Sequence, residues 1–307
     1  MPDMIRVENL GKRFAGGPAL DRVSLAVAQG RITIVAGADG AGKSTLFKIL
    51  VGLIKRDHGE IFFEERPVTD RFDSVTAVTG YMPERFSLYP DLSVEENLNF
   101  YADINGVSAA RREALKRTLL QKTGMLAFRR RRARALSGGM KQKLALSAIL
   151  LSAPRLILLD EPTTGVDPLS RIEFFKIIED LKAEGKTVVM ATPYLDEAEK
   201  GDHIVFLKNG RVIRQGDLRT LRREFPMKIL SLLPRDNIYE TVERLNRTPR
   251  LQGRLYIRGE FIRAWQAPGE DLRPLIPHSR CQEEPPRLED IYLYHERRRD
   301  REMEPLS

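Results

Sequence analysis

A short glycine-rich stretch decides the fold of this chain: Gly37-Ala38-Asp39-Gly40-Ala41-Gly42-Lys43-Ser44, followed by Thr45. Its spacing is that of a phosphate-binding loop, G-x-x-x-x-G-K-[ST]. Glycine tolerates the positive φ angles and the close approach that let backbone N–H groups surround a phosphate. In such a loop Lys43 neutralises the β- and γ-phosphates, and the Ser44 hydroxyl can ligate Mg²⁺. The stretch therefore predicts a site for a nucleoside phosphate.

The surroundings of the loop are those that such a site requires. Short apolar runs alternate with helical patterns through the first two hundred residues, which implies a largely parallel α/β sheet. Strands are predicted at Ile5–Leu10, Val23–Val27, Ile32–Ala36, Leu156–Leu159 and Thr187–Ala191, with a hairpin at Ile204–Lys208 and Arg211–Gln215 joined by an Asn-Gly turn. Helices are predicted at Ser44–Leu53, Val94–Ile104, Met140–Leu151 and Leu169–Leu181.

Two adjacent acids, Asp160 and Glu161, follow the predicted strand Leu156–Leu159. In an open parallel sheet, ligands bind beyond the carboxyl ends of the strands. Asp160 is therefore placed to hold Mg²⁺, and Glu161 is placed to polarise an attacking water as a general base. Taken alone, the pair could be a solvated acidic turn. The phosphate-binding loop makes the catalytic interpretation the stronger one.

A third motif places a hydroxyl and two glycines at the start of a predicted helix. Its residues are Leu136, Ser137, Gly138, Gly139, Met140, Lys141 and Gln142. Free N–H groups and the helix dipole make a helix N-terminus an anion-binding site. The chain therefore carries two phosphate-binding devices, whereas a kinase or GTPase with a phosphate-binding loop needs only one.

Together with Gly165-Val166-Asp167-Pro168, these motifs resemble those of the nucleotide-binding subunits of ABC transporters, over roughly Met4 to Arg222. The resemblance implies a P-loop NTPase fold of the ABC type, in which a mixed β-sheet core carries a helical subdomain at about 84–152. It implies that ATP is the nucleotide. It also implies that two such domains meet head to tail, so that ATP lies between one loop and the other domain's Ser137–Gly139.

The resemblance assigns roles to residues outside the three motifs. Phe14 matches the aromatic position that stacks on adenine, although a single Phe would otherwise be interpreted as core packing. Asp167 looks like the acid that communicates across the dimer. The segment Phe86–Leu98 is similar to the region of multidrug-export-type ABC ATPases that faces the permease. Pro286–Tyr292 resembles the close of the small C-terminal domain in those exporters.

Two positions depart from the family pattern. Glu84 stands where the family has a glutamine that approaches Mg²⁺ and the attacking water. Pro193 stands where the family has a histidine that bonds the γ-phosphate, and proline offers neither a polar side chain nor an N–H. Losing one preorganised donor to the transition state costs about 10²–10³ in rate. We therefore expect ATP to bind at this loop and to be hydrolysed slowly there.

The intact Ser137–Gly139 segment then predicts a heteromer. In that arrangement this chain completes a competent site on a second, fully equipped ABC ATPase subunit, and a homodimer with two slow sites is the alternative. Other classes of function are an ATP-dependent switch acting on a protein or a ribosome, and a catalytically inactive regulatory subunit. Pro193 supports the inactive subunit and Glu161 opposes it; the single ATPase domain and the segment around Tyr89 favour transport.

The net charge of +8 is concentrated in one region of the chain. Residues 111–134 contain ten Lys or Arg and one acid, so the remaining residues sum to about −1. Aromatic residues are not regularly interleaved there, and no nucleic-acid partner is expected. A solvated helical face is the favoured interpretation. A surface facing anionic lipid headgroups or an acidic partner loop is the alternative.

The chain is expected to act at the cytoplasmic side of the inner (plasma) membrane, beside a separate permease. No apolar run approaches the roughly 18–20 residues of a membrane span. Met1–Met4 lacks the features of a signal peptide, and the single cysteine, Cys281, suits a reducing compartment.

Three segments are expected along the 307 residues. The ATP-binding domain should span 4–222. From Phe225 to about His295 the chain is richer in Pro and Arg and has only short strand-like pieces, which indicates a small α+β accessory or regulatory domain at 225–295. The end, 296–307, is expected to be a charged, frayed tail.

Overall fold

The computed structural model describes residues 2–69, 72–85, 88–276 and 280–303. The chain divides into two compact units, Met1–Gln215 and Gly216–Ser307. Phe86 and Ser87, which belong to the segment predicted to face a permease, lie outside the described residues. No helix in the described part of the chain combines the length and the apolar character needed to cross a bilayer.

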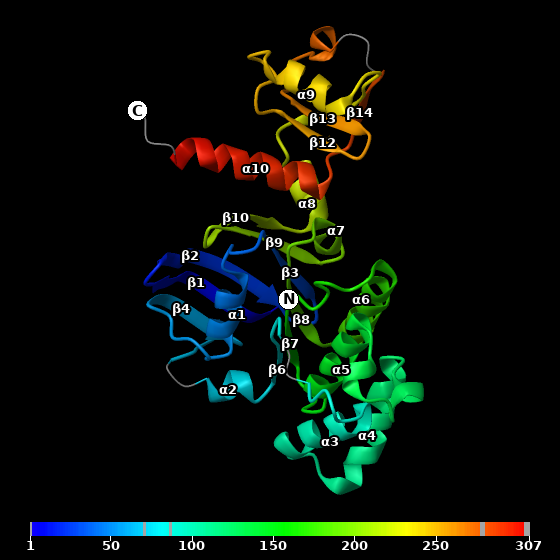
Figure 1. Ribbon diagram of the computed structural model, residues 1–307. Coiled ribbons are helices and arrows are strands. Elements are labelled where there is room, and N and C mark those ends of the chain that lie inside the picture. Colours follow the sequence, from blue (N-terminus) through cyan, green and yellow to red (C-terminus); the bar gives the residue numbers. More distant parts are fainter. Residues whose placement is uncertain (1, 70–71, 86–87, 277–279, 304–307) are drawn as a thin grey trace. The chain divides into compact units, whose positions relative to one another are not determined.

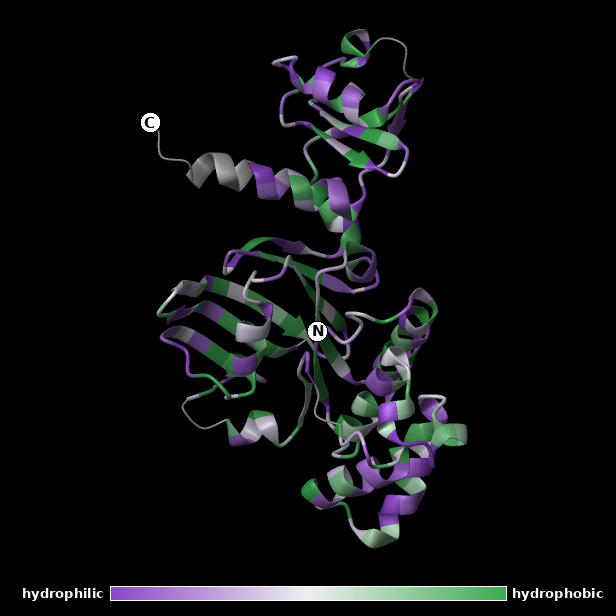
Figure 2. Cartoon of the chain, viewed as in Figure 1, coloured by the Kyte–Doolittle hydropathy of each residue, from purple (hydrophilic) through white to green (hydrophobic). Residues whose placement is uncertain are grey.

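The first unit is built on a six-stranded sheet with the order β10-β9-β3-β8-β7-β6 (Figure 1). Its strands are β3 (Ile32–Ala36), β6 (Thr79–Met82), β7 (Leu156–Asp160), β8 (Thr187–Thr192), β9 (His203–Lys208) and β10 (Arg211–Gly216). Strand β3 pairs in parallel with β8 and β9, and β7 pairs in parallel with β6 and β8. Every residue of β3, β7 and β8 is buried, as expected for parallel strands covered on both faces. These strands are largely green, that is hydrophobic, in Figure 2.

A second, four-stranded sheet corrects the expectation of one largely parallel sheet. Its order is β2-β1-β4-β5, and its strands are β1 (Asp3–Phe14), β2 (Gly17–Ala28), β4 (His58–Phe63) and β5 (Arg66–Pro67). All of its pairings are antiparallel. The physical reason is the short link between β1 and β2, because Phe14 pairs directly with Gly17. A parallel pair would need a crossover of a dozen or more residues.

Helices surround the six-stranded sheet and also form a group of their own. Helices α1 (Lys43–Leu50), α2 (Asp73–Thr76), α6 (Pro168–Ala183) and α7 (Leu195–Ala198) connect strands. Helices α3 (Val94–Ile104), α4 (Ala109–Lys122) and α5 (Gly138–Leu150) pack together, with the short turns η1 (Leu126–Phe128) and η2 (Ala133–Ala135) between α4 and α5 (Figure 1). Helix α3 has the predicted bounds because Ser93 and Glu96 form a capping box at its start. Helix α4 forms the first part of the solvated helical face predicted at 111–134 and buries only Lys116, Leu119 and Leu120, whereas Arg129–Arg132 lie outside any helix.

The second unit is an antiparallel four-stranded sheet with helices. Its elements are α8 (Leu218–Arg223), β11 (Lys228–Leu233), α9 (Ile238–Asn246), β12 (Leu255–Arg258), β13 (Phe261–Gln266), η3 (Arg273–Leu275), β14 (Arg280–Glu284) and α10 (Leu288–Met303). The strand order is β12-β13-β11-β14, and α9 packs on β12 and β13. Helix α10 continues to Met303, so the segment predicted as a charged, frayed tail from Glu296 has a helical backbone as far as that residue, and its fraying stays a prediction. Glu, Arg and Met favour helices, and this charged run therefore extends the helix.

Candidate nucleotide-binding site

The glycine-rich loop joins β3 to α1 and can only be made with glycine at two of its positions. Gly42 is the N-cap of α1 and has a φ of 105°, a conformation that side chains rarely adopt. A Cβ on Gly42 would lie 2.6 Å from the carbonyl oxygen of Ala19. A Cβ on Gly37 would lie 2.2 Å from the carbonyl oxygen of Leu207. The loop is therefore held tightly against β2 and β9, while Ala38, Asp39 and Gly40 remain exposed.

Lys43 lies at the start of α1, and its side chain is only 3% exposed. Its Nζ donates hydrogen bonds to the carbonyl oxygens of Gly37 (2.7 Å) and Ala38 (2.9 Å). The same ammonium lies 3.0 Å from Oε1 of Glu161. The loop thus wraps around the Lys43 ammonium. Both this cation and the N-terminal end of α1 favour a bound anion.

Ser44 and Asp160 bring two oxygen donors together across β7 and α1. The Ser44 hydroxyl donates to Asp160 Oδ1 at 3.0 Å, and the Tyr81 hydroxyl lies 3.4 Å from Oδ2. Burial raises the pKa of Asp160, and the nearby charges of Glu161 and Glu84 raise it further. Burial and Asp160 likewise raise the pKa of Tyr81. Because the charged form of Asp160 is disfavoured here, a cation bound beside it would stabilise that charged form.

The donor set at Ser44 and Asp160 fits Mg²⁺. Mg²⁺ prefers oxygen ligands and is usually held by one or two carboxylates together with substrate phosphates. Within the described residues there is no cluster of three or more His, Cys, Asp or Glu that could hold a metal ion by itself. The residues present therefore suit a metal that arrives with the phosphates better than one bound by the protein alone.

Glu161 has a strained backbone at the end of β7. Its φ is 51°, its N–H donates to the carbonyl oxygen of Ala191 (3.0 Å), and Oε2 accepts from the Thr164 hydroxyl (3.2 Å). Non-glycine residues in this conformation cluster at functional sites. The carboxylate points toward Lys43, an ion pair that the sequence did not predict. A phosphate that binds Lys43 has to compete with Glu161 for the ammonium.

The residues of the third motif begin α5. Ser137 is the N-cap, and its hydroxyl oxygen accepts from the Met140 N–H at 3.3 Å. Ser137 and Gly138 are exposed, Leu136 and Gly139 are buried, and Gln142 is half-buried. A Cβ on Gly139 would lie 2.4 Å from the Cβ of Ser170, at the start of α6. The first turns of α5 and α6 are therefore in direct contact.

Asp167 caps α6, just before Pro168. Its Oδ1 accepts from the Ser170 N–H at 2.9 Å, and this hydrogen bond lowers the pKa of Asp167. The side chain is exposed. The geometry thus gives Asp167 a structural role as a helix cap, beside the role across a dimer that the sequence predicts.

Phe14 and the start of α5, which carries Ser137 and Gly138, are two further candidate surfaces. Phe14, at the end of β1, is 46% exposed, and Lys12 Nζ lies 5.5 Å from the centre of its ring. Among the residues that the structure describes, no hydrogen bond or ion pair joins Ser137 or Gly138 to the loop residues Gly37–Ser44. A ring open to solvent and a separate anion-binding helix start are surfaces that can take up a ligand or a second subunit.

Pro193 directly follows β8, and a buried carboxylate that the sequence did not reveal lies beside it. Glu197 is 1% exposed. It accepts hydrogen bonds from the hydroxyls of Thr163 (2.7 Å) and Thr192 and from Arg171 Nε (2.9 Å). Glu197 thus ties the segment after Glu161 to the segment that carries Pro193. Its burial has no sequence signal, because acidic residues at 196 and 199 surround it.

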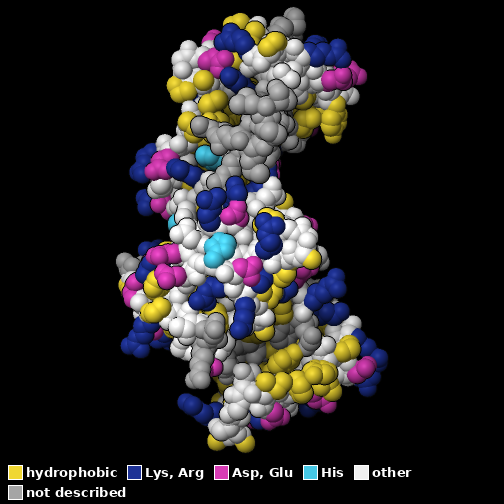
Figure 3. Space-filling view, turned by 90° about the vertical axis from the view of Figure 1, so that its left-hand side faces the viewer, with side chains coloured by type: hydrophobic (Ala, Val, Ile, Leu, Met, Phe, Trp, Pro, Cys, Tyr) yellow, Lys and Arg dark blue, Asp and Glu magenta, His cyan; other side chains and the backbone are white. Residues whose placement is uncertain are grey.

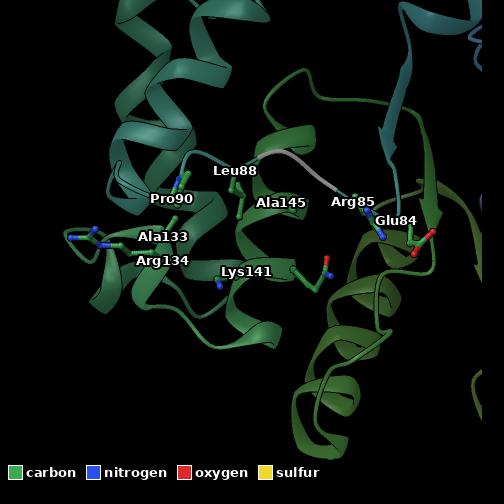
Figure 4. Close-up of a pocket in the computed structure, with 9 residues that line it drawn as sticks. Glu84, Arg85, Leu88, Pro90, Ala133, Arg134, Lys141 and Ala145 are labelled. Carbon is green, nitrogen blue, oxygen red and sulfur yellow. The ribbon is translucent and has the colours of Figure 1, made fainter.

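A groove of about 450 Å³ lies next to Glu84 (Figure 4). Its lining comes from the segment after β6, from the turn before α5 and from α5 itself. The lining residues are Glu84, Arg85, Leu88, Pro90, Ala133, Arg134, Lys141, Gln142 and Ala145. The groove therefore joins one candidate ATP-site residue, Glu84, to the segment that is predicted to face a permease.

Comparison with known proteins identifies the family. Residues 20–164 match the family described as "ABC transporter". The chain is 35% identical over 298 residues to the probable multidrug ABC transporter ATP-binding protein YbhF of Escherichia coli, covering 94% of this chain and 51% of that protein. It is 35% identical over 211 residues to the lantibiotic transport ATP-binding protein SrtF of Streptococcus pyogenes, covering 68% of this chain and 89% of that protein.

A solved structure agrees with these relatives. A dimeric, post-hydrolysis structure of the ATP-binding cassette MJ0796 with ADP and Pi superposes with a TM-score of 0.64 at 28% identity, over 70% of this chain and 99% of that chain. The fold and the loop thus define a P-loop nucleotide-binding protein. Within that class, the chain belongs to the ATP-binding proteins of ABC transporters. It spans about half the length of the first relative, YbhF.

Proposed function

We propose that this chain binds ATP with Mg²⁺ at its glycine-rich loop and hydrolyses it to drive export through a separate membrane permease. The observation that carries the proposal is the convergence of Lys43, Ser44, Asp160 and Glu161 at the carboxyl ends of β3 and β7. A cation, two metal-ligand oxygens and a general base are the groups that phosphoryl transfer to water needs.

Each residue has a defined task in this proposal. The loop N–H groups and Lys43 hold the β- and γ-phosphates, with the start of α1 adding the positive end of its dipole. Ser44 and Asp160 hold Mg²⁺, which when bound neutralises charge on the phosphates. Glu161 leaves its contact with Lys43 and orients the attacking water as general base. Phe14, which is exposed, stacks on the adenine.

Two such subunits are proposed to act together. The related cassette MJ0796 is dimeric in its structure with ADP and Pi. The exposed Ser137 and Gly138 at the start of α5 suit a phosphate of ATP held on the other subunit. Asp167 then lies near the joint between subunits, because its helix contacts the start of α5. These points support the head-to-tail arrangement expected from the sequence.

We further propose that the chain's own site is degenerate and that its partner is a different ATPase subunit. Pro193 has no polar side chain, and its backbone has no N–H. Glu84 places a carboxylate near Asp160, whose pKa it helps to raise. Both changes oppose the build-up of negative charge during hydrolysis. A homodimer with two slow sites is the alternative.

The groove beside Glu84 is proposed as the docking surface for the permease. It lies on the predicted permease-facing segment, of which Leu88 and Pro90 line it (Figure 4). The names of the relatives, a probable multidrug transporter protein and a lantibiotic transport protein, support a drug or a peptide as the cargo. The chain would thus sit peripherally on the cytoplasmic side of the membrane, with 4–222 as its ATPase domain and 225–295 as an accessory or regulatory domain.

Steady-state ATP hydrolysis by the purified chain tests this proposal, beside Pro193→His and Glu161→Gln variants. We expect slow hydrolysis by the natural chain and a gain of about tenfold or more for Pro193→His, since one transition-state donor is worth about 10²–10³. Brisk hydrolysis that Glu161→Gln abolishes would instead show a self-sufficient ATPase. ATP binding without hydrolysis in any variant would show an inactive regulatory subunit.

A further inference from the structure

The basic residues at 111–134 divide into two groups in the structure. Four of them form ion pairs with carboxylates on neighbouring elements. These pairs are Arg112 with Asp103, Lys116 with Glu95 and Glu113, Lys122 with Glu184, and Arg134 with Asp91. The other six form no ion pair within the described part of the chain: Arg111, Arg117, Arg129, Arg130, Arg131 and Arg132. Four of the six basic residues outside ion pairs therefore form one run, in which Arg129 and Arg132 act on the nearby carboxylates of Glu113 and Glu96 without forming an ion pair.

This run, Arg129–Arg132, is called the arginine turn below, and its backbone is fixed in place. The carbonyl oxygens of Arg129 and Arg131 accept from the N–H groups of Glu95 and Val94, each at 2.9 Å. These donors belong to the first turn of α3, where N–H groups lack partners within the helix. All four side chains of the turn are exposed. The turn thus holds the carbonyls of Arg129 and Arg131 against α3 and leaves four exposed side chains, of which that of Arg131 also lies over the Phe128 ring.

The arginine turn adjoins the groove beside Glu84. The next two residues, Ala133 and Arg134, line that groove, and their N–H groups donate to the carbonyl oxygens of Leu92 and Pro90, each at 2.9 Å. The arginines of the turn are not among the groove's lining residues. Figure 3 shows basic side chains bordering an area of hydrophobic ones at the lower end of the first unit. A permease seated in the groove would hold the turn close to the bilayer.

We propose that the arginine turn binds the anionic phosphate headgroups of the membrane surface, an inference that rests on the proposed docking of a permease. Arginine presents a planar fork of donors that matches phosphate, and it is more weakly hydrated than lysine. Clustered basic residues next to a membrane bind anionic lipids. All four side chains of the turn are exposed, and none lines the groove. Four exposed arginines outside a cavity suit a surface that carries many phosphates better than one acidic protein segment.

Vesicle binding by the full chain tests the proposal, with vesicles of phosphatidylcholine alone and vesicles containing phosphatidylglycerol. The test variant replaces all four arginines of the turn by glutamine. The control variant removes the same number of charges from exposed basic residues without an ion pair among the described residues: Lys55, Arg66, Arg235 and Arg244. Both variants have the same net charge, so any difference between them reports the position of the charges.

Each basic residue near an anionic surface strengthens binding about fivefold. We therefore expect the natural chain and the control variant to bind the anionic vesicles, and the turn variant to bind them at least about tenfold more weakly. Binding to the anionic vesicles should fall as salt is added. Equal binding by the turn and control variants would overturn the proposal, as would failure of the natural chain to prefer anionic vesicles; an acidic protein partner would then be the better explanation of the turn.

Hydrolysis and nucleotide binding are measured on the same variants. Because the turn contains none of the candidate ATP-site residues, both activities should be unchanged in the turn variant. Loss of vesicle binding with ATP binding intact supports the arginine turn alone. Failure of the natural chain to bind ATP overturns the proposed function and leaves the vesicle result to be judged by itself.

Discussion

Two buried aspartates, one in each unit, have opposite electrostatic surroundings. Other buried charges of the first unit, such as Glu197 with Arg171, are paired. In the second unit, Asp290 is fully buried beside Arg263, which is 2% exposed. Its Oδ1 accepts from Tyr256 (2.6 Å) and Arg263 Nε (2.9 Å), and Oδ2 accepts from Arg263 Nη2 (2.8 Å) and the Arg287 N–H (2.7 Å). Arg263 also donates to Glu284 at 2.6 Å. Every charge in this network has a partner of opposite sign.

In the first unit, Asp160 is 1% exposed, and among the residues that the structure describes its side-chain hydrogen bonds come from two hydroxyls, those of Ser44 and Tyr81. Its neighbours Glu161 and Glu84 carry the same sign of charge, and its pKa is raised, mainly by burial. The pKa of Glu284 in the second unit is lowered, mainly by its hydrogen bond with Arg263. A buried charge that is fully paired cannot lose its partner without a large cost, whereas one left short of counter-charge is available for a ligand.

The largest effect should come from Glu161→Gln. A general base contributes about 10²–10⁴ to a rate. If an assembled site with a partner subunit is active through Glu161, its turnover should fall by that factor while ATP binding stays. Phosphate release measured beside equilibrium nucleotide binding separates the two. If turnover and nucleotide binding fell by the same factor, Glu161 would serve only to hold Lys43.

Asp290→Ala should damage the second unit strongly without touching the ATP site. Removing one partner of a buried ion pair costs about 3–5 kcal/mol, because the other charge is left unpaired. Denaturant unfolding of the full chain measures this loss. The matched control replaces Asp290 by Leu and Arg263 by Met together, which should recover most of the stability. A small loss for Asp290→Ala would break the contrast between the two units.

Asp160→Asn should change the stability of the fold in the opposite direction to Asp290→Ala. It removes a buried, poorly compensated charge while keeping the size of the side chain, so we expect it to raise the free energy of unfolding by about 1 kcal/mol. The same change should abolish Mg²⁺-dependent hydrolysis. Thermal unfolding and phosphate release on one preparation check both effects. A destabilised Asn variant would show that Asp160 is satisfied in the fold after all.

The smallest effect is a difference in pH dependence. The lowered pKa of Glu284 stabilises the fold above its unfolded value of 4.5, and this contribution is lost as the pH falls below it. The raised pKa of Asp160 destabilises the fold near neutral pH, and this penalty disappears as the pH falls toward 3.8. At neutral pH, Glu284→Gln should lower the free energy of unfolding and Asp160→Asn should raise it. Both effects should become smaller in acid. Unfolding curves from pH 7 down to about pH 3 would show whether they do.

The elements around the loop could be predicted from sequence because their signals are local. Val94–Ile104 has its capping residues next to it, and the predicted strands at 32–36, 156–159 and 187–191 are continuous apolar runs that the structure places as β3, β7 and β8. The Asn209-Gly210 turn also occurs as predicted, with positive φ at both residues. Membership of the ABC family follows from the same motifs and is confirmed.

What the sequence could not give depends on contacts between distant residues. The separate antiparallel sheet is set by the pairing of β1 with both β2 and β4. The Lys43–Glu161 ion pair joins residues that are far apart in the chain. Glu197 is buried although the acidic residues near it, Asp196 and Glu199, are not buried. The helical face predicted at 111–134 ends at Lys122, and the backbone of Arg129–Arg132 is held by the start of α3 instead. The roles of Glu84, Phe14, Asp167 and Pro193 stay predictions.

The contact between Gly139 and Ser170 has a mechanical consequence. Since a methyl group at Gly139 would collide with Ser170, the first turns of α5 and α6 approach more closely than two helices with side chains between them could. A nucleotide on a second subunit that displaced Ser137 would therefore press on the helix that Asp167 caps. The missing side chain of one glycine thus places an exposed helix start directly against its neighbour.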